Sequence, residues 1–145
     1  AGDGMLLRDL PVDALQAFAG FAASPAGMPL LSVEFRLLGG ELAPGRGEGG
    51  AVADLDAGFV AFAGGMVATS EHAAAVDASL DALAELLRPW TAETTYLNFA
   101  ERRVGPEVVF GESLSRLRRI KTAYDRQDRI RGNHPVEPHG MPEGA

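Results

Sequence analysis

The sequence contains no cysteine, and this absence excludes disulfide bonds, thiol catalysis and thiolate metal sites. It also lacks a long apolar run, because the longest one, residues 57–68, falls short of the roughly 18 residues that a membrane span requires. The N-terminus carries acidic residues where a signal peptide has a basic and then an apolar region. We therefore expect no membrane partner and a cytoplasmic location, with secretion as the alternative.

Basic residues are scarce in the first 100 positions, which hold four of them against thirteen acidic residues. Residues 101–135 reverse this balance, with nine basic and five acidic residues. The basic segment is short and adjoins an acidic body, and the whole chain has a net charge of −7, so no nucleic-acid partner is expected. A solvated helix face is the simpler interpretation of the basic segment.

Three segments have the apolar spacing of amphipathic helices, namely residues 9–24, 69–90 and 112–124. In the second, Thr69 or Ser70 can cap the N-terminus and Pro89 ends the helix. In the third, the residues expected to face inward are Leu114, Leu117, Ile120 and Tyr124.

Two segments between these helices are typical of strands. Residues 30–38 alternate between apolar and polar side chains, and the apolar run 57–68 is typical of a buried strand. The glycine-rich residues 39–50 between them lack the spacing of a phosphate-binding loop, and we expect a mobile loop there.

The stretch TTYLNFAE, residues 94–101, alternates in a way that predicts a third strand. In an extended chain Leu97 and Phe99 share one face, while Tyr96 and Asn98 share the other. The predicted order is therefore helix, strand, strand, helix, strand, helix. This order favours an α+β fold with an antiparallel or mixed sheet and helices packed on one face, which leaves the second face open to solvent or to a ligand.

The block TYLNFAE followed by FGESLSRLRRIKTAYDRQDRIRGNHPV resembles the C-terminal end of berberine bridge enzyme-like FAD-linked oxidoreductases. That family combines a Y-x-N-[FY]-x-[DE] strand with an [FY]-G helix that ends in L-x-x-[IV]-K-x-x-Y-D-P and a terminus of the form F-R-x-N-x-x-[IV]. Residues 94–136 carry the most specific part of the likeness. A weaker likeness upstream, through LRDLP and LLSVEFRLLGGEL, extends it over roughly residues 6–136. We assign residues 1–136 to the substrate-domain portion and expect residues 137–145 to be a disordered tail.

The resemblance implies that the chain is the C-terminal substrate-domain portion of a larger FAD-dependent oxidase. The full-length enzyme would transfer a hydride from an alcohol, sugar or secondary-metabolite carbon to flavin, with O2 as the final acceptor. It would bind FAD mainly through an N-terminal domain that nothing in this sequence resembles, so this chain alone is expected to be inactive. Its partners would be a small-molecule substrate and either that FAD-binding domain or a second copy, through an exposed sheet edge.

The resemblance also implies roles for individual residues. Tyr96 is the expected catalytic residue, and Tyr96, Asn98 and, with less support, Asn133 are the expected flavin contacts. A phenol titrates near pH 10 in water, so it serves as a base near neutrality only where its neighbours assist. No metal site is expected.

Departures from the family pattern fall around the expected substrate pocket, which we assign to Glu34, Arg36, Leu38 and Phe62. Relatives often place a polar group just before the Gly-Gly pair, where this chain has Leu37 and Leu38, and others use a glutamate on the next strand, where it has Phe62. These apolar replacements keep a second hypothesis open, in which the chain is a non-catalytic binding or assembly module that has lost its FAD domain.

Overall fold

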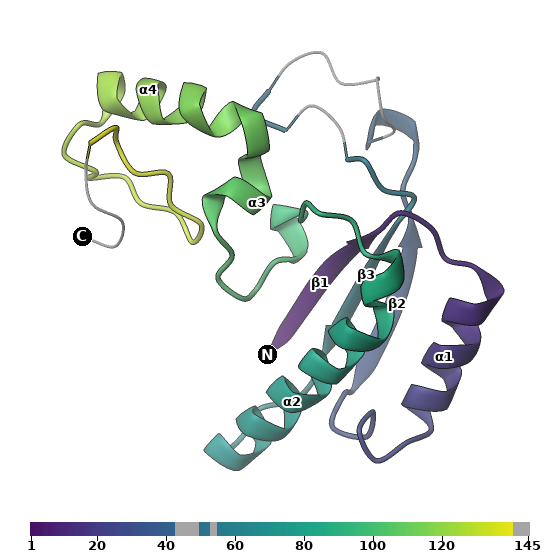
Figure 1. Cartoon of the computed structure of the whole chain (residues 1–145). Coiled ribbons are helices and arrows are strands. Elements are labelled where there is room, and N and C mark those ends of the chain that lie inside the picture. Colours follow the sequence, from purple (N-terminus) through teal and green to yellow (C-terminus); the bar gives the residue numbers. More distant parts are fainter. Residues whose placement is uncertain (43–49, 53–54, 141–145) are drawn as a thin grey trace.

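The computed structural model describes residues 1–42, 50–52 and 55–140. The strands and α-helices are β1 (Gly2–Leu7), α1 (Val12–Ala22), β2 (Ser32–Leu37), β3 (Phe59–Gly64), α2 (Ser70–Leu87), α3 (Pro106–Phe110) and α4 (Leu114–Tyr124). Single 3-10 turns cover Gly40–Leu42, Arg88–Trp90, Leu97–Phe99 and Gly111–Ser113. The sheet carries α1 and α2 on one face, while α4 stands apart from it (Figure 1), so the predicted α+β class is confirmed.

The three strands form one antiparallel sheet in the order β1-β3-β2. In the central strand β3, Ala61 is opposite Met5 on one side and Phe35 on the other. The predicted strands at 30–38 and 57–68 are present and shorter than expected. The strand β1 was not predicted, because its glycines and Asp3 are poor strand formers and only pairing with β3 holds them extended.

The helices predicted over residues 9–24 and 69–90 correspond to α1 and α2. Thr69 supplies the N-cap of α2, since its Oγ1 accepts a hydrogen bond from the His72 backbone N–H at 3.2 Å. At the other end the chain passes into the 3-10 turn that contains Pro89. Within the part of the chain that the structure describes, no helix is both long and apolar enough to cross a membrane.

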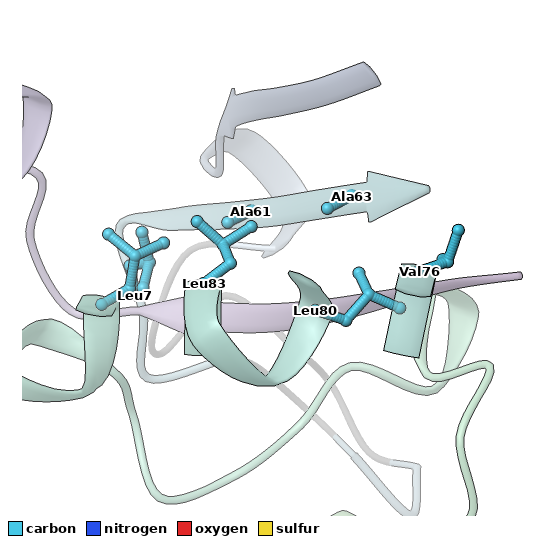
Figure 2. Packing of buried hydrophobic residues seen from close by; sticks show 7 residues of the cluster. Leu7, Ala61, Ala63, Val76, Leu80 and Leu83 are labelled. Carbon is cyan, nitrogen blue, oxygen red and sulfur yellow. The ribbon is translucent and has the colours of Figure 1, made fainter. Parts of the chain in front are cut away.

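The main core lies between the sheet and α2. Its buried residues are Leu7, Ala61, Ala63, Val76, Leu80, Leu83 and Leu87, each at most 3% exposed. The β3 alanines take up little space, and Figure 2 shows the side chains of α2 directed at the strand surface around them. This close packing fixes the sheet against α2 and leaves its opposite face free for other groups.

The C-terminal region departs from the predicted single helix over 112–124. The chain forms α3, a 3-10 turn and then α4, and α4 packs against α3 rather than on the sheet (Figure 1). Leu114 is buried as expected, but Ile120 is 43% and Tyr124 89% exposed, so the expectation that these two face inward is wrong. The apolar spacing showed which residues share a face of the helix, but not whether another element covers that face.

Two further expectations concern segments at the limits of the described residues. Most of the glycine-rich segment expected to be a mobile loop, residues 43–49, lies outside them. In the expected disordered tail, Pro138 is buried and the His139 backbone N–H donates to Thr122 Oγ1 at 2.7 Å. The packed part of the chain thus continues beyond residue 136, and residues 141–145 are not described.

Candidate functional site

The candidate site lies on the second face of the sheet, opposite α1 and α2. Leu7, Phe35 and Ala61 pack in the helix-side core, so their neighbours along each strand point the other way. The predicted pocket residues Glu34, Arg36 and Phe62 occupy this second face. Leu38 also packs there, against a small cluster formed by the buried residues Leu6, Leu55 and Val60.

Residues 91–100 cross this face, so only part of it stays open. Thr91 forms an isolated bridge with Leu7, and the Ala92 N–H donates to the Leu6 carbonyl at 2.8 Å. Further on, Tyr96 and Phe99 pack against the Leu6, Leu55 and Val60 cluster. Gly4 permits this crossing, because a Cβ there would lie 2.6 Å from the Cβ of Phe99.

The strand predicted over residues 94–99 is wrong. Tyr96 is extended, but Leu97–Phe99 form a 3-10 turn. The physical reason is that Phe99 packs down onto the sheet at Gly4, so the chain passes over the face instead of extending alongside β1. Phe99 therefore does not lie on the face opposite Tyr96, as the alternation predicts, but contacts the ring of Tyr96.

Tyr96 and Asn98 meet despite the different backbone. The Asn98 side-chain Nδ2 donates a hydrogen bond to the Tyr96 hydroxyl oxygen at 2.9 Å. The hydroxyl proton of Tyr96 is left free to donate elsewhere. The turn at residues 97–99 thus brings together a phenol and an amide, two groups with complementary hydrogen-bonding capacity.

An aromatic cluster of Phe62, Tyr96 and Phe99 links this pair to the strands. The Phe99 ring lies 5.5 Å from that of Tyr96 and 5.7 Å from that of Phe62, in tilted contacts. The guanidinium carbon of Arg36 lies 5.1 Å from the Phe99 ring centre, and Arg36 Nη2 pairs with Glu34 Oε1 at 2.6 Å. Phe99 therefore connects the Tyr96–Asn98 pair to the charged pair on β2.

Sequence reasoning did not identify Phe99 or Gly4 as parts of the site. A usable signal in the sequence was the spacing of Gly2 and Gly4, which are two residues apart and share one face of β1. An added Cβ on Gly2 would meet Phe62, and one on Gly4 would meet Phe99. Glycines two residues apart in a strand mark a place where another group approaches the backbone closely.

A cavity of about 260 Å³ opens beside Tyr96 and Asn98. It has apolar walls and a polar margin, and its lining residues are Leu42, Val52, Leu55, Leu97, Thr95, Tyr96 and Asn98. Small-molecule sites commonly combine such apolar walls with a few polar groups that orient the ligand.

Asn133 is exposed, and among the residues described no hydrogen bond joins it to Tyr96 or Asn98. Its neighbour His134 reaches back toward the site instead, with Nε2 at 2.9 Å from the carbonyl oxygen of Ala100. The structure therefore brings the C-terminal segment to the residue that follows Phe99, while the role expected for Asn133 stays a prediction.

Arg102 fixes the C-terminal end of residues 91–100. Its guanidinium contacts Asp81 at 2.5 Å and Asp77 at 3.0 Å, both on α2, and lies 4.0 Å from Asp3 of β1. Partial burial opposes the charged form, but hydrogen bonds and charge from Asp81 and Asp77 outweigh it and raise the pKa of Arg102. Arg102 thus ties the end of residues 91–100 to both α2 and β1.

Comparison with known proteins connects this geometry to a family. Residues 95–137, which include Tyr96, Asn98 and Asn133, match the family described as "Berberine and berberine like". The resemblance to berberine bridge enzyme-like proteins is confirmed. No curated protein sequence matches the chain.

Solved structures extend the likeness to the fold. BBE-like 1 from Physcomitrella patens, as wild type and as a variant, superimposes with a TM-score of 0.68 at 15% sequence identity. Each comparison covers 87% of this chain and 28% of that chain. The chain thus spans little more than a quarter of the berberine bridge enzyme-like structures that it matches, and its fold corresponds to one part of them.

Berberine bridge enzyme-like proteins are FAD-linked oxidoreductases in general. The residues on the second face fit the ring end of such a cofactor, because a phenol, an amide and half-buried aromatic rings suit a planar ring with a polar margin. The candidate residues include no glycine-rich loop or helix N-terminus of the kind that binds a pyrophosphate. The candidate residues that the structure describes therefore suit one side of a flavin ring rather than the pyrophosphate of FAD.

Proposed function

We propose that this chain is the substrate-domain part of an FAD-dependent oxidase that removes a hydride from an alcohol, sugar or secondary-metabolite carbon, with O2 as the final electron acceptor. The hydrogen bond between Asn98 and Tyr96, within the segment that matches the berberine-like family, carries the proposal. The likeness of the fold to part of a BBE-like protein supports it.

In this proposal Tyr96 handles the proton of the substrate hydroxyl. FAD, when bound, supplies the acceptor for the hydride. Asn98 holds the Tyr96 hydroxyl in place and directs an N–H at its oxygen, which stabilises negative charge whenever the phenol proton leaves. The two side chains would act as one unit, with Tyr96 as the catalytic residue and Asn98 as the positioning residue.

Other residues of the second face would position the substrate. Phe62 and Phe99 offer apolar ring surface, while Glu34 and Arg36 offer hydrogen-bonding groups on β2. Phe62 stands where other members of the family use a glutamate, so the proton-handling role falls on Tyr96. The cavity beside Tyr96 gives a small molecule access to the phenol.

The partner required by this proposal is an FAD-binding domain. It would cover the second face and close the site from its open side, and water would be excluded only in the assembled protein. The isolated chain is accordingly expected to be inactive.

The decisive experiment joins this chain to its upstream coding region and purifies the product. A yellow protein with a flavin spectrum is expected, and Y96F should lower kcat by about 10²- to 10⁴-fold, the usual contribution of a positioned acid or base. The matched control is Y124F, because Tyr124 is 89% exposed on α4 and is the only other tyrosine. A joined protein without flavin contradicts the proposal, and unchanged turnover in Y96F removes the role of Tyr96.

A second candidate function is a non-catalytic binding or assembly module. The apolar side chains at Leu38 and Phe62, where the family has polar groups, favour it. This alternative predicts that the joined protein binds its partner equally well as wild type and as Y96F, with no turnover in either case.

A further inference from the structure

Ala100 follows the turn that carries Asn98, and both of its backbone polar groups are hydrogen-bonded within the chain. Its N–H donates to the Leu97 carbonyl at 3.3 Å, which closes the turn. Its carbonyl accepts a hydrogen bond from His134 Nε2 at 2.9 Å. Ala100 is only 7% exposed, so removal of the imidazole would leave a largely buried carbonyl without its partner.

The hydrogen bond to Ala100 defines which ring nitrogen of His134 carries the proton. A carbonyl oxygen can only accept, so Nε2 must be the donor. Nδ1 is buried and has no hydrogen-bond partner among the described residues, which fits the unprotonated nitrogen of a neutral imidazole. His134 is therefore a fixed donor directed at the end of the turn.

The segment that carries His134 is itself anchored on α4. After α4 the chain doubles back toward α3 (Figure 1). Before His134, the Ile130 N–H donates to Asp125 Oδ2 at 2.9 Å, and after it the His139 N–H donates to Thr122 Oγ1 at 2.7 Å. The segment is thus held on both sides of the imidazole, so His134 links a fixed part of the C-terminal region to the candidate site.

The C-terminal region also contacts the other end of the same turn. The Thr95 N–H donates to the carbonyl of Val108 in α3 at 3.4 Å. Thr95 directly precedes Tyr96, so the contacts at Thr95 and Ala100 bracket the turn that carries the phenol and the amide. The bond to Val108 is longer than the usual N–H···O range, which makes the bond from His134 the stronger of the two.

We propose that His134 is a positioning residue for the Tyr96–Asn98 pair and that it acts by holding the Ala100 carbonyl. Asn98 lies two residues before Ala100, so the direction of its side-chain N–H toward the Tyr96 hydroxyl depends on the backbone that His134 holds. The catalytic consequence rests on the proposed function of Tyr96, whereas the hydrogen bonds themselves do not.

The contacts behind this role are internal to the described chain. They join the C-terminal segment to residues 91–100, and none of them involves a surface left open. Tyr96 and Asn98 should therefore keep their hydrogen bond in this chain alone, before any flavin or second domain is present.

NMR of the 145-residue chain tests the geometry without flavin. Long-range 1H–15N spectra at slightly alkaline pH should show the His134 proton on Nε2. H134L removes the donor, and the Asn98 side-chain amide protons should then move toward the shifts of an exposed amide such as that of Gln127. H134Q places an amide N–H near the former position of Nε2 and should retain the wild-type Asn98 shifts.

The matched control is H139L. It removes an exposed imidazole from the same segment and keeps the backbone N–H that contacts Thr122, so it should leave the Asn98 shifts unchanged. Circular dichroism checks that each variant keeps its helices. Should H134L fail to fold, H134N takes its place, because the shorter asparagine amide falls short of the Ala100 carbonyl.

Kinetics of the chain joined to its upstream region test the catalytic consequence. H134L should lower kcat and kcat/KM together by about 10- to 100-fold at unchanged flavin content, since a misplacement of about 1 Å can cost about 10²-fold. H134Q should restore most of the turnover, and H139L should match the wild type.

The role of His134 is overturned if its proton lies on Nδ1, if H134L leaves the Asn98 shifts unchanged or keeps full turnover, or if H134Q loses turnover as fully as H134L. A joined protein without flavin contradicts the proposed function instead. The Asn98 shifts in this chain then still decide whether His134 holds the turn.

Discussion

The helix-covered side of the sheet and the C-terminal region are stabilised by different interactions. On the helix side, Leu7, Leu83 and Leu87 are completely buried in an apolar core. In the C-terminal region, Ile120 and Tyr124 are exposed, and charged side chains fix the chain after α4. The stability of the helix-covered side depends on apolar packing, which does not vary with protonation. The stability of the C-terminal region depends on charged groups that titrate.

Lys121 and Asp125 organise the C-terminal region. Lys121 Nζ lies 2.6 Å from Asp125 Oδ2 and 2.9 Å from Asp128 Oδ1, and it also donates to the Ile130 carbonyl. Asp125 accepts the backbone N–H groups of Arg129 and Ile130 at 2.8 and 2.9 Å. The hydrogen bond from Lys121, followed by those from the two backbone amides, lowers the pKa of Asp125 to about 2.

The largest expected effect comes from the apolar core. L83A should lower the free energy of unfolding by about 2–5 kcal/mol, because it leaves a cavity between α2 and β3. I120A on α4 should change it by less than about 1 kcal/mol, since Ile120 is 43% exposed. Urea denaturation measures both, and equal losses in the two variants would contradict the difference between the regions.

A smaller effect is expected where residues 91–100 cross the sheet. G4A should destabilise the chain by about 1–3 kcal/mol, because the new Cβ would lie 2.6 Å from the Cβ and 2.9 Å from the carbonyl oxygen of Phe99. G39A, where an added Cβ meets nothing within 4 Å, is the control.

Thermal unfolding and the NMR shifts of the Tyr96 and Phe99 rings measure the effect of G4A. Ring shifts identical to those of the wild type would show that Phe99 does not depend on Gly4 for its position.

The smallest effect concerns pH. Asp125 has a lower pKa in the folded chain than the usual 3.8, so its contribution to stability is complete above that pH and is lost as the pH falls toward 2. As the pH falls through this range, the amides of Arg129 and Ile130 should therefore lose protection from exchange relative to the amides of β3. D125N should remove this pH-dependent difference between the two regions. Hydrogen exchange read by NMR provides the measurement, and parallel behaviour of both regions in the wild type would refute it.

Sequence periodicity predicted the elements that carry their own signals. The apolar face of α2, its Thr69 cap and the nearby Pro89 identified that helix, and alternation identified β2. The strand β1 escaped prediction, because its pairing with β3 extends a glycine-containing segment. The strand predicted over 94–99 failed for a related reason, since contact with Gly4 turns the chain.

The candidate site was predictable in its members more than in its geometry. The Y-x-N-F pattern of the resembling family singled out Tyr96 and Asn98, and alternation placed Glu34 and Arg36 on one face. The resemblance added Phe62. The contacts of Phe99 with Tyr96 and Arg36 were not predictable, because they join three segments that are distant in the sequence.

The sequence by itself determined α1, α2, the body of α4, two of the three strands and the residue types of the candidate site, because these depend on spacing along the chain. Only the tertiary structure decided that residues 91–100 cross the second face, that Gly4 and Phe99 meet there and that Ile120 and Tyr124 of α4 are exposed. Those outcomes depend on which surfaces are packed together, and the free energy of burying one surface depends on the partner that covers it.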